Sequence, residues 1–449
     1  MTLAESWLWL EHFTNLEKLP SATKRTWRLD RMHALLSERG HPERAMIGVH
    51  LAGSKGKGST AAFLASILTQ GGWSTGLYAS PHVADWRERI TRNGEFFAEQ
   101  AYTDTVARLR TYWETMAPEV RSRFIDDWGG EPTTFEWLTL AAFELFRHEG
   151  LDAQVLETGL GGRLDATNTQ VPLASVLTLI EREHTEILGD TLPLIAAEKA
   201  GIIKPGVPVF TAPQSLEVLN VFRQKAKESG SRLYSFDEEI DDLDVGLEPT
   251  GTRLLVEFAD GSGVQAHLQV LGLAQGTNAA LAALVIKTLV AEGLLPLNTH
   301  LTLEEVLKRG LETVTLTGRM QVLQHDPLVV VDGAHTARSV QLLTKSWKQL
   351  FGGGTLVFGA FAGKDIEAMV AWLAPVFSRV VVTKPGTFRP SDPEALAQAF
   401  TNASQRPEVV EIAASPAEAL AWALNLPNPG PVLVCGSFYL VGEILNSRK

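Results

Sequence analysis

The stretch "VHLAGSKGKGST", Val49 to Thr60, decides how the first part of this chain folds. It follows the apolar run "IGVHLA" and precedes the helical pattern "AAFLASILTQGG", so it joins a strand to a helix. At such a junction, backbone N–H groups and a lysine can surround phosphate oxygens. The sequence departs from the usual phosphate-loop motif, G-x-x-x-x-G-K-[ST]. Leu51 stands at the first glycine position, and Gly58 separates Lys57 from Ser59.

We interpret this stretch as a phosphate loop. Lys57 is expected to neutralise phosphate charge, and Ser59 or Thr60 to offer a hydroxyl to a metal ion. An ordinary glycine-rich turn is the alternative, and the density of glycine and lysine argues against it. The expected nucleotide contacts are Gly53, Ser54, Lys55, Gly56, Lys57, Gly58, Ser59 and Thr60.

Short apolar runs alternate with helical patterns along the whole chain, which is typical of α/β folds with largely parallel sheets. The alternation pauses near residues 294–318 and then resumes with "LVVVDGAH". We therefore predict two domains: an N-terminal P-loop-type ATPase domain, residues 1–298, and a C-terminal Rossmann-like α/β domain, residues 318–449. Residues 299–317 are expected to link them.

Composition narrows the classes of ligand. A formal charge of −12 over 449 residues argues against a broad nucleic-acid or anionic-membrane surface. The N-terminus has no basic leader pattern, and no segment approaches the roughly 20 apolar residues of a membrane span. Cys435 is the single cysteine, so no intrachain disulfide can form. We expect a cytoplasmic protein with small-molecule substrates.

Other motifs follow predicted strands, at the edge where α/β sheets bind ligands. Ser80 lies in "YASPH", where a plain turn is an equal alternative, and Glu157 ends "AQVLE" at a place where a carboxylate can reach a hard cation. His184 follows "SVLTLI", and Lys199 lies on the next helical pattern, where a surface lysine is the default reading. Phe135 in "TTFEW" is compatible with either core packing or a ligand contact.

Taken together, these segments resemble the folate branch of the Mur ligase superfamily, the folylpolyglutamate and dihydrofolate synthases. The matching patterns are G-x-x-G-K-G-[ST], S-P-H, E-x-G-x-G-G-x-x-D-[AS]-T-N, D-H-x-x-x-L-G and E-K-A-G-I-[IF]-K-x-G. They occur in family order over essentially the whole chain. Glu183 departs from the pattern by replacing Asp.

The resemblance implies ATP and two Mg²⁺ ions as cofactors. It implies metal contacts from Ser59, Ser80, Glu157 and His184, and a carbamate on Lys199 that would support the second metal. The pterin-bearing substrate would then contact Phe135, Arg163, Leu164, Asp165 and Ala166.

In the second half, the resemblance assigns nucleotide contacts to Gln275, Asn278, Arg319 and Asp332. His335 would face the incoming amino acid as a catalytic group, and Arg389 and Ser437 would contact substrate. Several family positions differ here: Ala274 replaces His, Thr317 replaces Pro, Thr336 and Ala337 replace Asn-Pro, and Gly363 replaces Asp.

The implied reaction is ATP-dependent ligation of L-glutamate to a folate or dihydropteroate carboxylate through an acyl phosphate. We expect both acceptors to be used, by a monomer. Two alternatives stay open: a Mur-type ligase of cell-wall synthesis, and an ATP-binding module without ligase activity.

Overall fold

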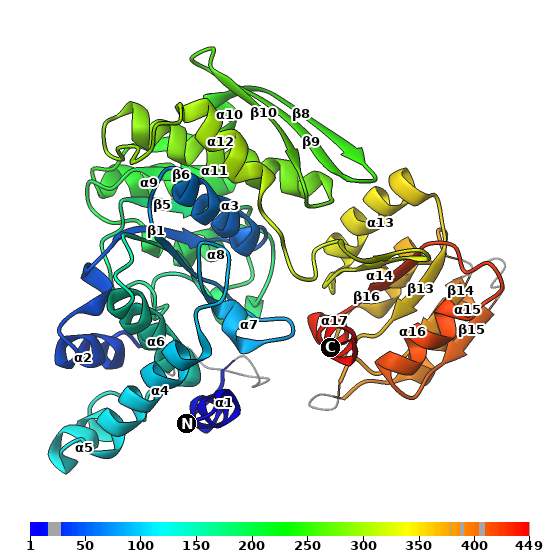
Figure 1. Ribbon diagram of the computed structural model, residues 1–449, viewed down its shortest axis with the longest axis horizontal. Helices are drawn as coiled ribbons and strands as arrows, with labels where there is room; N and C mark the ends of the chain where they lie inside the picture. Colours follow the sequence, from blue (N-terminus) through cyan, green and yellow to red (C-terminus); the bar gives the residue numbers. More distant parts are fainter. Residues whose placement is uncertain (17–27, 378, 387–389, 404–408, 449) are drawn as a thin grey trace.

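The computed structural model describes residues 1–16, 28–377, 379–386, 390–403 and 409–448. Within them the chain forms three sheets, and the two larger ones belong to two separate α/β bodies (Figure 1). The predicted fold class, two α/β domains with mostly parallel sheets, is confirmed.

The first sheet has seven strands in the order β3-β2-β4-β1-β5-β6-β7. All neighbours pair in parallel except β3, which runs antiparallel to β2. The strands are β1 (Ile47–Ala52), β2 (Thr75–Tyr78), β3 (Ile90–Arg92), β4 (Ala153–Glu157), β5 (Ala174–Leu177), β6 (Val209–Thr211) and β7 (Leu233–Ser235). Because β1 lies between β4 and β5, the loops that follow these three strands meet at one edge.

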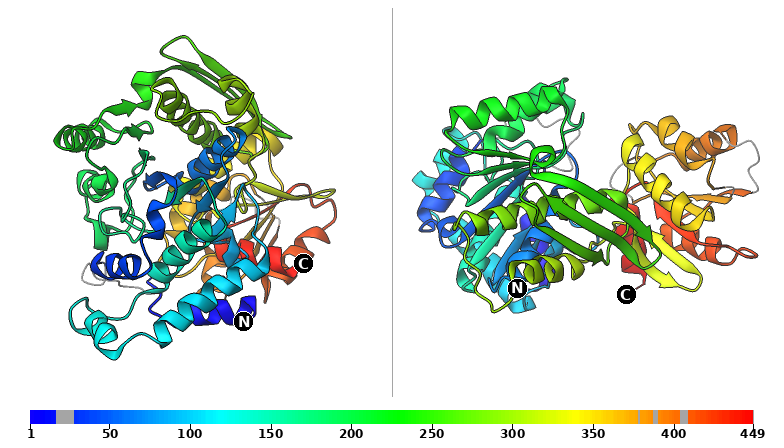
Figure 2. Two further views of the ribbon diagram at one scale, coloured as in Figure 1. Left: turned by 60° about the vertical axis from the view of Figure 1, so that its left-hand side comes forward. Right: turned by 90° about the horizontal axis from the view of Figure 1, so that it is seen from above.

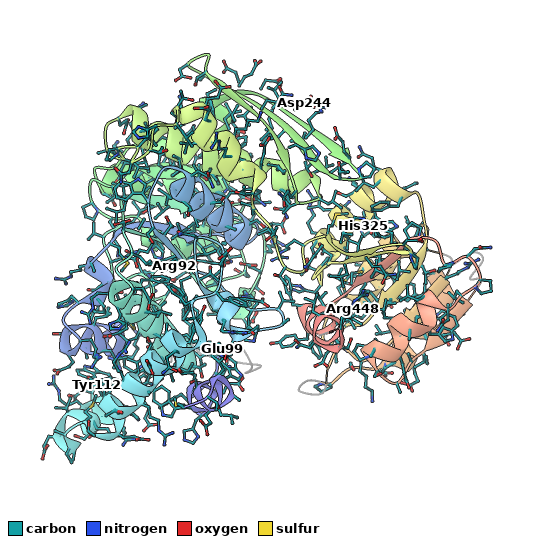
Figure 3. All side chains as sticks on the ribbon, in the orientation of Figure 1. Arg92, Glu99, Tyr112, Asp244, His325 and Arg448 are labelled. Atoms are coloured by element: carbon teal, nitrogen blue, oxygen red, sulfur yellow. The ribbon has the colours of Figure 1, made fainter. Side chains whose placement is uncertain are left out.

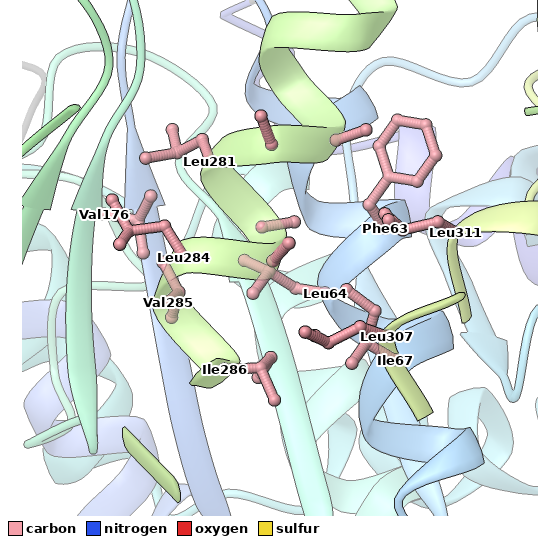
Figure 4. Close-up of a cluster of buried hydrophobic side chains, with 14 of the residues drawn as sticks. Phe63, Leu64, Ile67, Val176, Leu281, Leu284, Val285, Ile286, Leu307 and Leu311 are labelled. Carbon is pink, nitrogen blue, oxygen red and sulfur yellow. The ribbon is translucent and has the colours of Figure 1, made fainter. Parts of the chain in front are cut away.

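Helices cover both faces of this sheet. Val155 and its neighbour Leu156 belong to different buried clusters, as alternation along a strand requires. One face is covered by α3 (Lys57–Gln70), α11 (Leu273–Ala291) and α12 (Leu303–Glu312). Their apolar side chains form one cluster, in which Phe63 and Ile67 of α3 lie beside Leu311 and Leu307 of α12, and Leu281 and Leu284 of α11 lie toward Val176 of β5 (Figure 4).

The other face carries the N-terminal and central helices. These are α1 (Leu3–Glu11), α2 (Asp30–Glu38), α4 (Glu99–Glu114), α5 (Pro118–Asp126) and α6 (Thr134–His148). The helix α6 begins with a capping box between Thr133 and Glu136, and Glu136 also forms a buried ion pair with Arg31 at 3.0 Å. Further along the sheet lie α7 (Thr185–Leu188), α8 (Leu192–Lys199), α9 (Leu216–Glu228) and α10 (Phe236–Glu239).

The length and composition of α11 would allow it to cross a membrane, but 67% of that apolar window is buried inside the protein. Its alanines and leucines pack against α3, the strands and α12. This helix is therefore a core helix of the first body.

A small antiparallel sheet follows, with strands β8 (Ile240–Glu248), β9 (Gly251–Phe258) and β10 (Gly263–Leu268). Strands β9 and β10 form a hairpin, and β8 pairs with the other edge of β9. In "IDDLDVGLE" the apolar alternation begins only at Leu243, after Asp241 and Asp242, where the pairing with β9 also shifts register. The sheet extends toward α13 (Ala337–Phe351) of the second body (Figure 2).

The second body has six strands in the order β11-β12-β16-β13-β14-β15. Only β11 is antiparallel among the described strands. The strands are β11 (Gln321–His325), β12 (Leu328–Val331), β13 (Thr355–Phe358), β14 (Arg379–Val382), β15 (Val409–Ile412) and β16 (Val432–Cys435). Helices α13, α14 (Ile366–Leu373), α15 (Pro393–Ala403), α16 (Pro416–Leu424) and α17 (Phe438–Ser447) surround them.

The segment 299–317, expected to be a linker, contains α12. Val306, Leu307 and Leu311 of this helix are buried in the same cluster as α3 and α11. Most of the segment is therefore part of the first body, because α12 carries a strongly apolar face that a free linker would expose. The domain limits themselves remain a prediction.

We predict that Gly310→Ala destabilises the first body. A Cβ at this position would lie 2.5 Å from Ile67 Cα in α3, so the two helices would have to separate. Alanine in a helix is otherwise favoured over glycine by about 1 kcal/mol. We expect overpacking to outweigh this gain and to lower the free energy of unfolding by about 1–3 kcal/mol, measured by urea denaturation.

The matched control is Lys308→Ala on the exposed side of the same helix, which should change stability by less than about 0.5 kcal/mol. A Gly310→Ala protein as stable as the parent would contradict the tight contact between α12 and α3.

Candidate functional site

The predicted phosphate loop connects the end of β1 at Ala52 to the start of α3 at Lys57, so the expected strand–loop–helix context is confirmed. Gly56 caps α3 with φ of +87°, and a Cβ there would overlap Asn278 Oδ1. Only glycine satisfies both constraints. The free N–H groups of the first turn of α3 and its dipole favour an anion at this end.

Two lysine ammonium groups meet at this loop. Lys57 Nζ donates to the Gly53 carbonyl oxygen at 2.9 Å, and Lys199 Nζ donates to the same oxygen at 2.7 Å. Lys199 is 1% exposed, which excludes the reading of a surface lysine. Burial, reinforced by the charge of Lys57, lowers the pKa of Lys199 to about 8.

Glu183 balances part of this charge. Its carboxylate lies 3.0 Å from Lys199 Nζ and 3.9 Å from Lys55 Nζ. Burial raises the pKa of Glu183, but the charges of Lys199, Lys57 and Lys55 outweigh burial and keep the pKa below its ordinary value. Glu183 is therefore ionised at neutral pH, and the substitution of Glu for the family's Asp keeps a carboxylate at this position.

Glu157 ends β4 and lies against the first turn of α3. Its Oε2 accepts a hydrogen bond from Ser80 N at 3.0 Å, and a Cβ on Gly58 would lie only 3.1 Å from the same oxygen. Burial raises the pKa of Glu157, against the charges of Lys57 and Arg319. The structure thus brings Glu157, Ser80 and the loop together, as the sequence predicts.

His184 directly follows Glu183 in a left-handed backbone conformation with φ of 47°. Burial lowers the pKa of His184, and the charge of Glu183 opposes this shift. A neutral imidazole keeps a lone pair with which it can bind a metal ion. Ser59 and Thr60 are both buried, and Thr60 Oγ1 has no hydrogen-bond partner among the described residues.

Among the residues that the structure describes, no group of three or more His, Cys, Asp or Glu side chains lies close enough together to hold a metal ion without other ligands. A cation here would therefore depend on Glu157 and His184 together with hydroxyls and ligand oxygens. The Glu157 carboxylate fits that use, since within the described chain its one hydrogen bond comes from Ser80 N and leaves Oε1 available.

The loop after Glu157 is braced by Asp165. Its Oδ2 accepts from Gly159 N and Leu160 N at 2.9 and 3.1 Å, and its Oδ1 accepts from the backbone and hydroxyl of Thr167 at 3.1 and 2.6 Å. The carboxylate predicted to border substrate thus holds the shape of its own loop.

The other predicted pterin contacts lie around this loop. The Phe135 ring packs on Gly159, where a Cβ would lie 2.7 Å from the ring, and it is 5.8 Å from the Tyr78 ring. Arg163 forms an ion pair with Glu198 at 3.1 Å on the surface. Leu164 is half-buried and Ala166 is buried, so the side chains of residues 163–166 do not share one face.

The second body contributes Arg319. Its guanidinium lies 4.4 Å from the centre of the Phe438 ring and makes no hydrogen bond among the described residues. Burial lowers the pKa of Arg319, while the charges of Asp332 and Glu157 oppose this. Its donors are therefore available to an anion between the two bodies.

Asp332 and His335 follow β12. The two carboxylate oxygens of Asp332 accept from Met320 N at 2.8 Å and Ala334 N at 2.7 Å. His335 Nδ1 bonds to the Gly333 carbonyl at 2.8 Å, which places the proton on Nδ1 and the lone pair on Nε2. Burial lowers the pKa of His335 to about 4, so the ring is neutral.

The remaining predicted residues have structural partners. Asn278 Nδ2 donates to Gln275 Oε1 at 3.1 Å beside the phosphate loop, and Ser437 caps α17 by accepting from Tyr439 N at 3.1 Å. Thr336, which departs from the family pattern, caps α13. Arg389 lies outside the described residues.

Sequence reasoning missed Phe438. This ring fills the space that a side chain at Gly333 would need, lies under Arg319 and packs 5.8 Å from the His335 ring. Its position next to Ser437 was the only available signal, because its partners lie about 100 residues away. It therefore packs against two predicted site residues, Arg319 and His335.

Comparisons with known proteins identify the family to which the chain belongs. The Mur ligase middle domain matches residues 51–286, and the Mur ligase glutamate ligase domain matches residues 318–438. The chain is 32% identical over 416 residues to a folylpolyglutamate synthase of Lacticaseibacillus casei, covering 92% of each chain. It is 33% identical over 351 residues to a dihydrofolate synthase/folylpolyglutamate synthase of Bacillus subtilis, covering 78% of this chain and 79% of the relative.

A solved structure is similar throughout. It is the Mycobacterium tuberculosis folylpolyglutamate synthase complexed with ADP and AMPPCP, which superposes with a TM-score of 0.84 at 27% identity and covers 99% of this chain and 98% of its own. The domain matches, the extent of the sequence identity and the shared fold lead to one conclusion: this chain belongs to the folylpolyglutamate synthase family of the Mur ligase superfamily.

Proposed function

We propose that this protein is an ATP-dependent ligase that joins L-glutamate to a carboxylate of folate or dihydropteroate. The observation that carries the proposal is the convergence of positive charge from both bodies on the start of α3. Lys57 lies in the loop, and Arg319 extends from the second body toward Glu157. Such a site favours phosphoryl groups, whose negative charge grows during transfer.

In this mechanism the phosphate loop, residues 53–60, and Arg319 hold the ATP phosphates. The acceptor carboxylate oxygen attacks the γ-phosphorus, and the bond between this phosphorus and the β–γ bridging oxygen breaks. ADP departs, and the acceptor becomes an acyl phosphate. The glutamate nitrogen then attacks the acyl carbon and phosphate departs. His335 is neutral with a free Nε2 lone pair, so it can accept a hydrogen bond from the incoming amino group and orient it toward the acyl carbon. The proton that the nitrogen loses can leave with the departing phosphate.

Glu157, His184, Ser59 and Ser80 would hold Mg²⁺ in this site. Bound Mg²⁺ would offset phosphate charge. Burial raises the pKa of Glu157, and the nearby charges of Lys57 and Arg319 and the hydrogen bond from Ser80 N oppose this by favouring the ionised form that a metal ion needs. Gln275 and Asn278 are assigned to the adenine side of the nucleotide, and Asp332 to the ribose.

The acceptor would bind at Phe135 and residues 163–166. The Lacticaseibacillus casei relative is named for one activity and the Bacillus subtilis relative for two. We propose that this chain uses both acceptors, with Arg389 and Ser437 toward substrate carboxylate groups. We further propose a cytoplasmic monomer with domains 1–298 and 318–449 that binds neither nucleic acid nor membrane.

Lys57→Ala should lower kcat for glutamate ligation by about 10²–10³, because it removes a half-buried cation where phosphoryl charge develops. Ligation is measured by mass spectrometry with Mg·ATP, a reduced folate and L-glutamate. The fold should be unchanged, since Lys57 lies at a helix start and its one described hydrogen bond is to Gly53.

The control is Lys227→Ala on the exposed side of α9, which should ligate glutamate at the parent rate. A folded Lys57→Ala protein with parental turnover would refute the assignment of this loop to the ATP phosphates.

We also propose that Lys199 carries a carbamate, formed when its neutral amine attacks CO₂ and releases a proton. With a pKa of about 8, the neutral fraction is far larger at neutral pH than for an exposed lysine, and it rises further as the pH increases past 8. The enzyme incubated with ¹³C-bicarbonate at pH 8 should show a carbamate carbon signal by NMR.

Lys199→Arg should remove that signal. Lys204→Arg should retain it, although burial also lowers the pKa of Lys204. A spectrum that is the same for the parent and Lys199→Arg would overturn the carbamate.

A further inference from the structure

Glu88 organises the loop that follows β2. Its Oε2 accepts from Val83 N at 2.7 Å, and its Oε1 accepts from Ala84 N at 3.0 Å and Asp85 N at 2.9 Å. One carboxylate therefore binds three successive backbone N–H groups. Such a run of N–H groups forms a concave donor site for an anion, and here the chain supplies the anion itself.

The start of this loop belongs to the proposed active site. Ser80 N donates to Glu157 Oε2 at 3.0 Å, and Glu157 in turn lies against Gly58 of α3. The backbone at residue 80 thus has to hold a fixed position relative to the phosphate loop.

The middle of the loop contacts the second body. A Cβ on Gly442 of α17 would overlap the Val83 carbonyl oxygen, so that helix packs directly on the loop backbone. A Cβ on Gly318 would lie 3.5 Å from the Val83 side chain, and Asn446 Nδ2 donates to Ala84 O at 3.4 Å. Gly318 immediately precedes Arg319, so this contact also bears on the proposed phosphate arginine.

We propose that Glu88 is a positioning residue that couples docking of the second body to the geometry around Glu157. By fixing Val83, Ala84 and Asp85, it sets the surface on which α17 and Gly318 rest while the same loop holds Ser80 against Glu157. The claim that this geometry serves catalysis rests on the proposed ligase function; the claim that Glu88 holds the docking loop does not.

The chemistry makes the carboxylate hard to replace. In Glu88→Gln, one oxygen is exchanged for an NH₂ group, which cannot accept from Val83 N or from the other two amides. At least one N–H then loses its partner and the loop loosens. Asp85 still caps the following turn through Arg87 N at 2.9 Å, so the local fold should survive.

Two measurements on the full-length protein test this. In Glu88→Gln, hydrogen exchange of the amides of residues 83–85 should accelerate at least tenfold while other first-body amides keep their rates. In the ligase assay, kcat should fall at least tenfold with little change in KM for the folate acceptor, because its proposed pterin contacts, Phe135 and residues 163–166, lie within the first body.

Gly442→Ala disturbs the same contact from the side of the second body, because its methyl group would push α17 away from Val83. It should also lower kcat, and the double variant Glu88→Gln/Gly442→Ala should be no slower than the slower single variant. The matched control is Glu99→Gln, an exposed carboxylate whose ion pair with Arg87 spans 3.2 Å (Figure 3). It should leave both exchange and kcat unchanged.

Parental exchange at residues 83–85 in Glu88→Gln would overturn the proposal, and so would independent, multiplicative effects of the two substitutions on kcat. Failure of the proposed function has a different signature: the parent itself would then not ligate glutamate, while accelerated exchange in Glu88→Gln alone would still establish the docking role. If Glu88→Gln does not fold, Gly442→Ala with parental kcat would overturn the coupling.

Discussion

The sharing of one carbonyl oxygen by two ammonium groups is the interaction on which the site depends. Lys57 and Lys199 both donate to Gly53 O, within a protein interior where like charges repel strongly. Glu183 offsets part of that repulsion, and the lowered pKa of Lys199 shows that an excess of positive charge and a burial cost remain. A polyanionic ligand, or the carbamate proposed on Lys199, would offset this excess, which supports the proposed binding of phosphate groups at this loop.

The fold supplies the positions that this charge pattern needs. The strands β1, β4 and β5 are neighbours, so the phosphate loop, Glu157 and the Glu183–His184 segment leave the sheet at one edge. The second body is a separate sheet that contributes Arg319, held over Phe438 of α17. Because the same helix rests on Val83, the arginine and the first-body loops are tied to one interface.

Much of this was predictable from short sequence patterns. The strand–loop–helix junction, Glu157 at a strand end and the doubling of α/β units all depend on neighbours within a few residues. The strand β8 was missed because its apolar alternation is short and begins only after two consecutive aspartates, Asp241 and Asp242. Phe438 was missed because its partners are set by tertiary contacts. The backbone partners of Glu88 lie only three to five residues away, but its importance depends on the packing of α17 on the same loop. Asp165 shows that the hydrogen-bonding capacity of a residue in a ligand motif can be used by its own loop.

The most direct test of this account is product formation with each acceptor supplied separately. Dihydropteroate and a reduced folate monoglutamate would each be incubated with Mg·ATP and L-glutamate, and the products identified by mass spectrometry. The account predicts addition of glutamate to both acceptors with release of ADP and phosphate. No product from either acceptor, together with ADP release when a muramyl-type nucleotide is offered, would contradict it and indicate a cell-wall ligase.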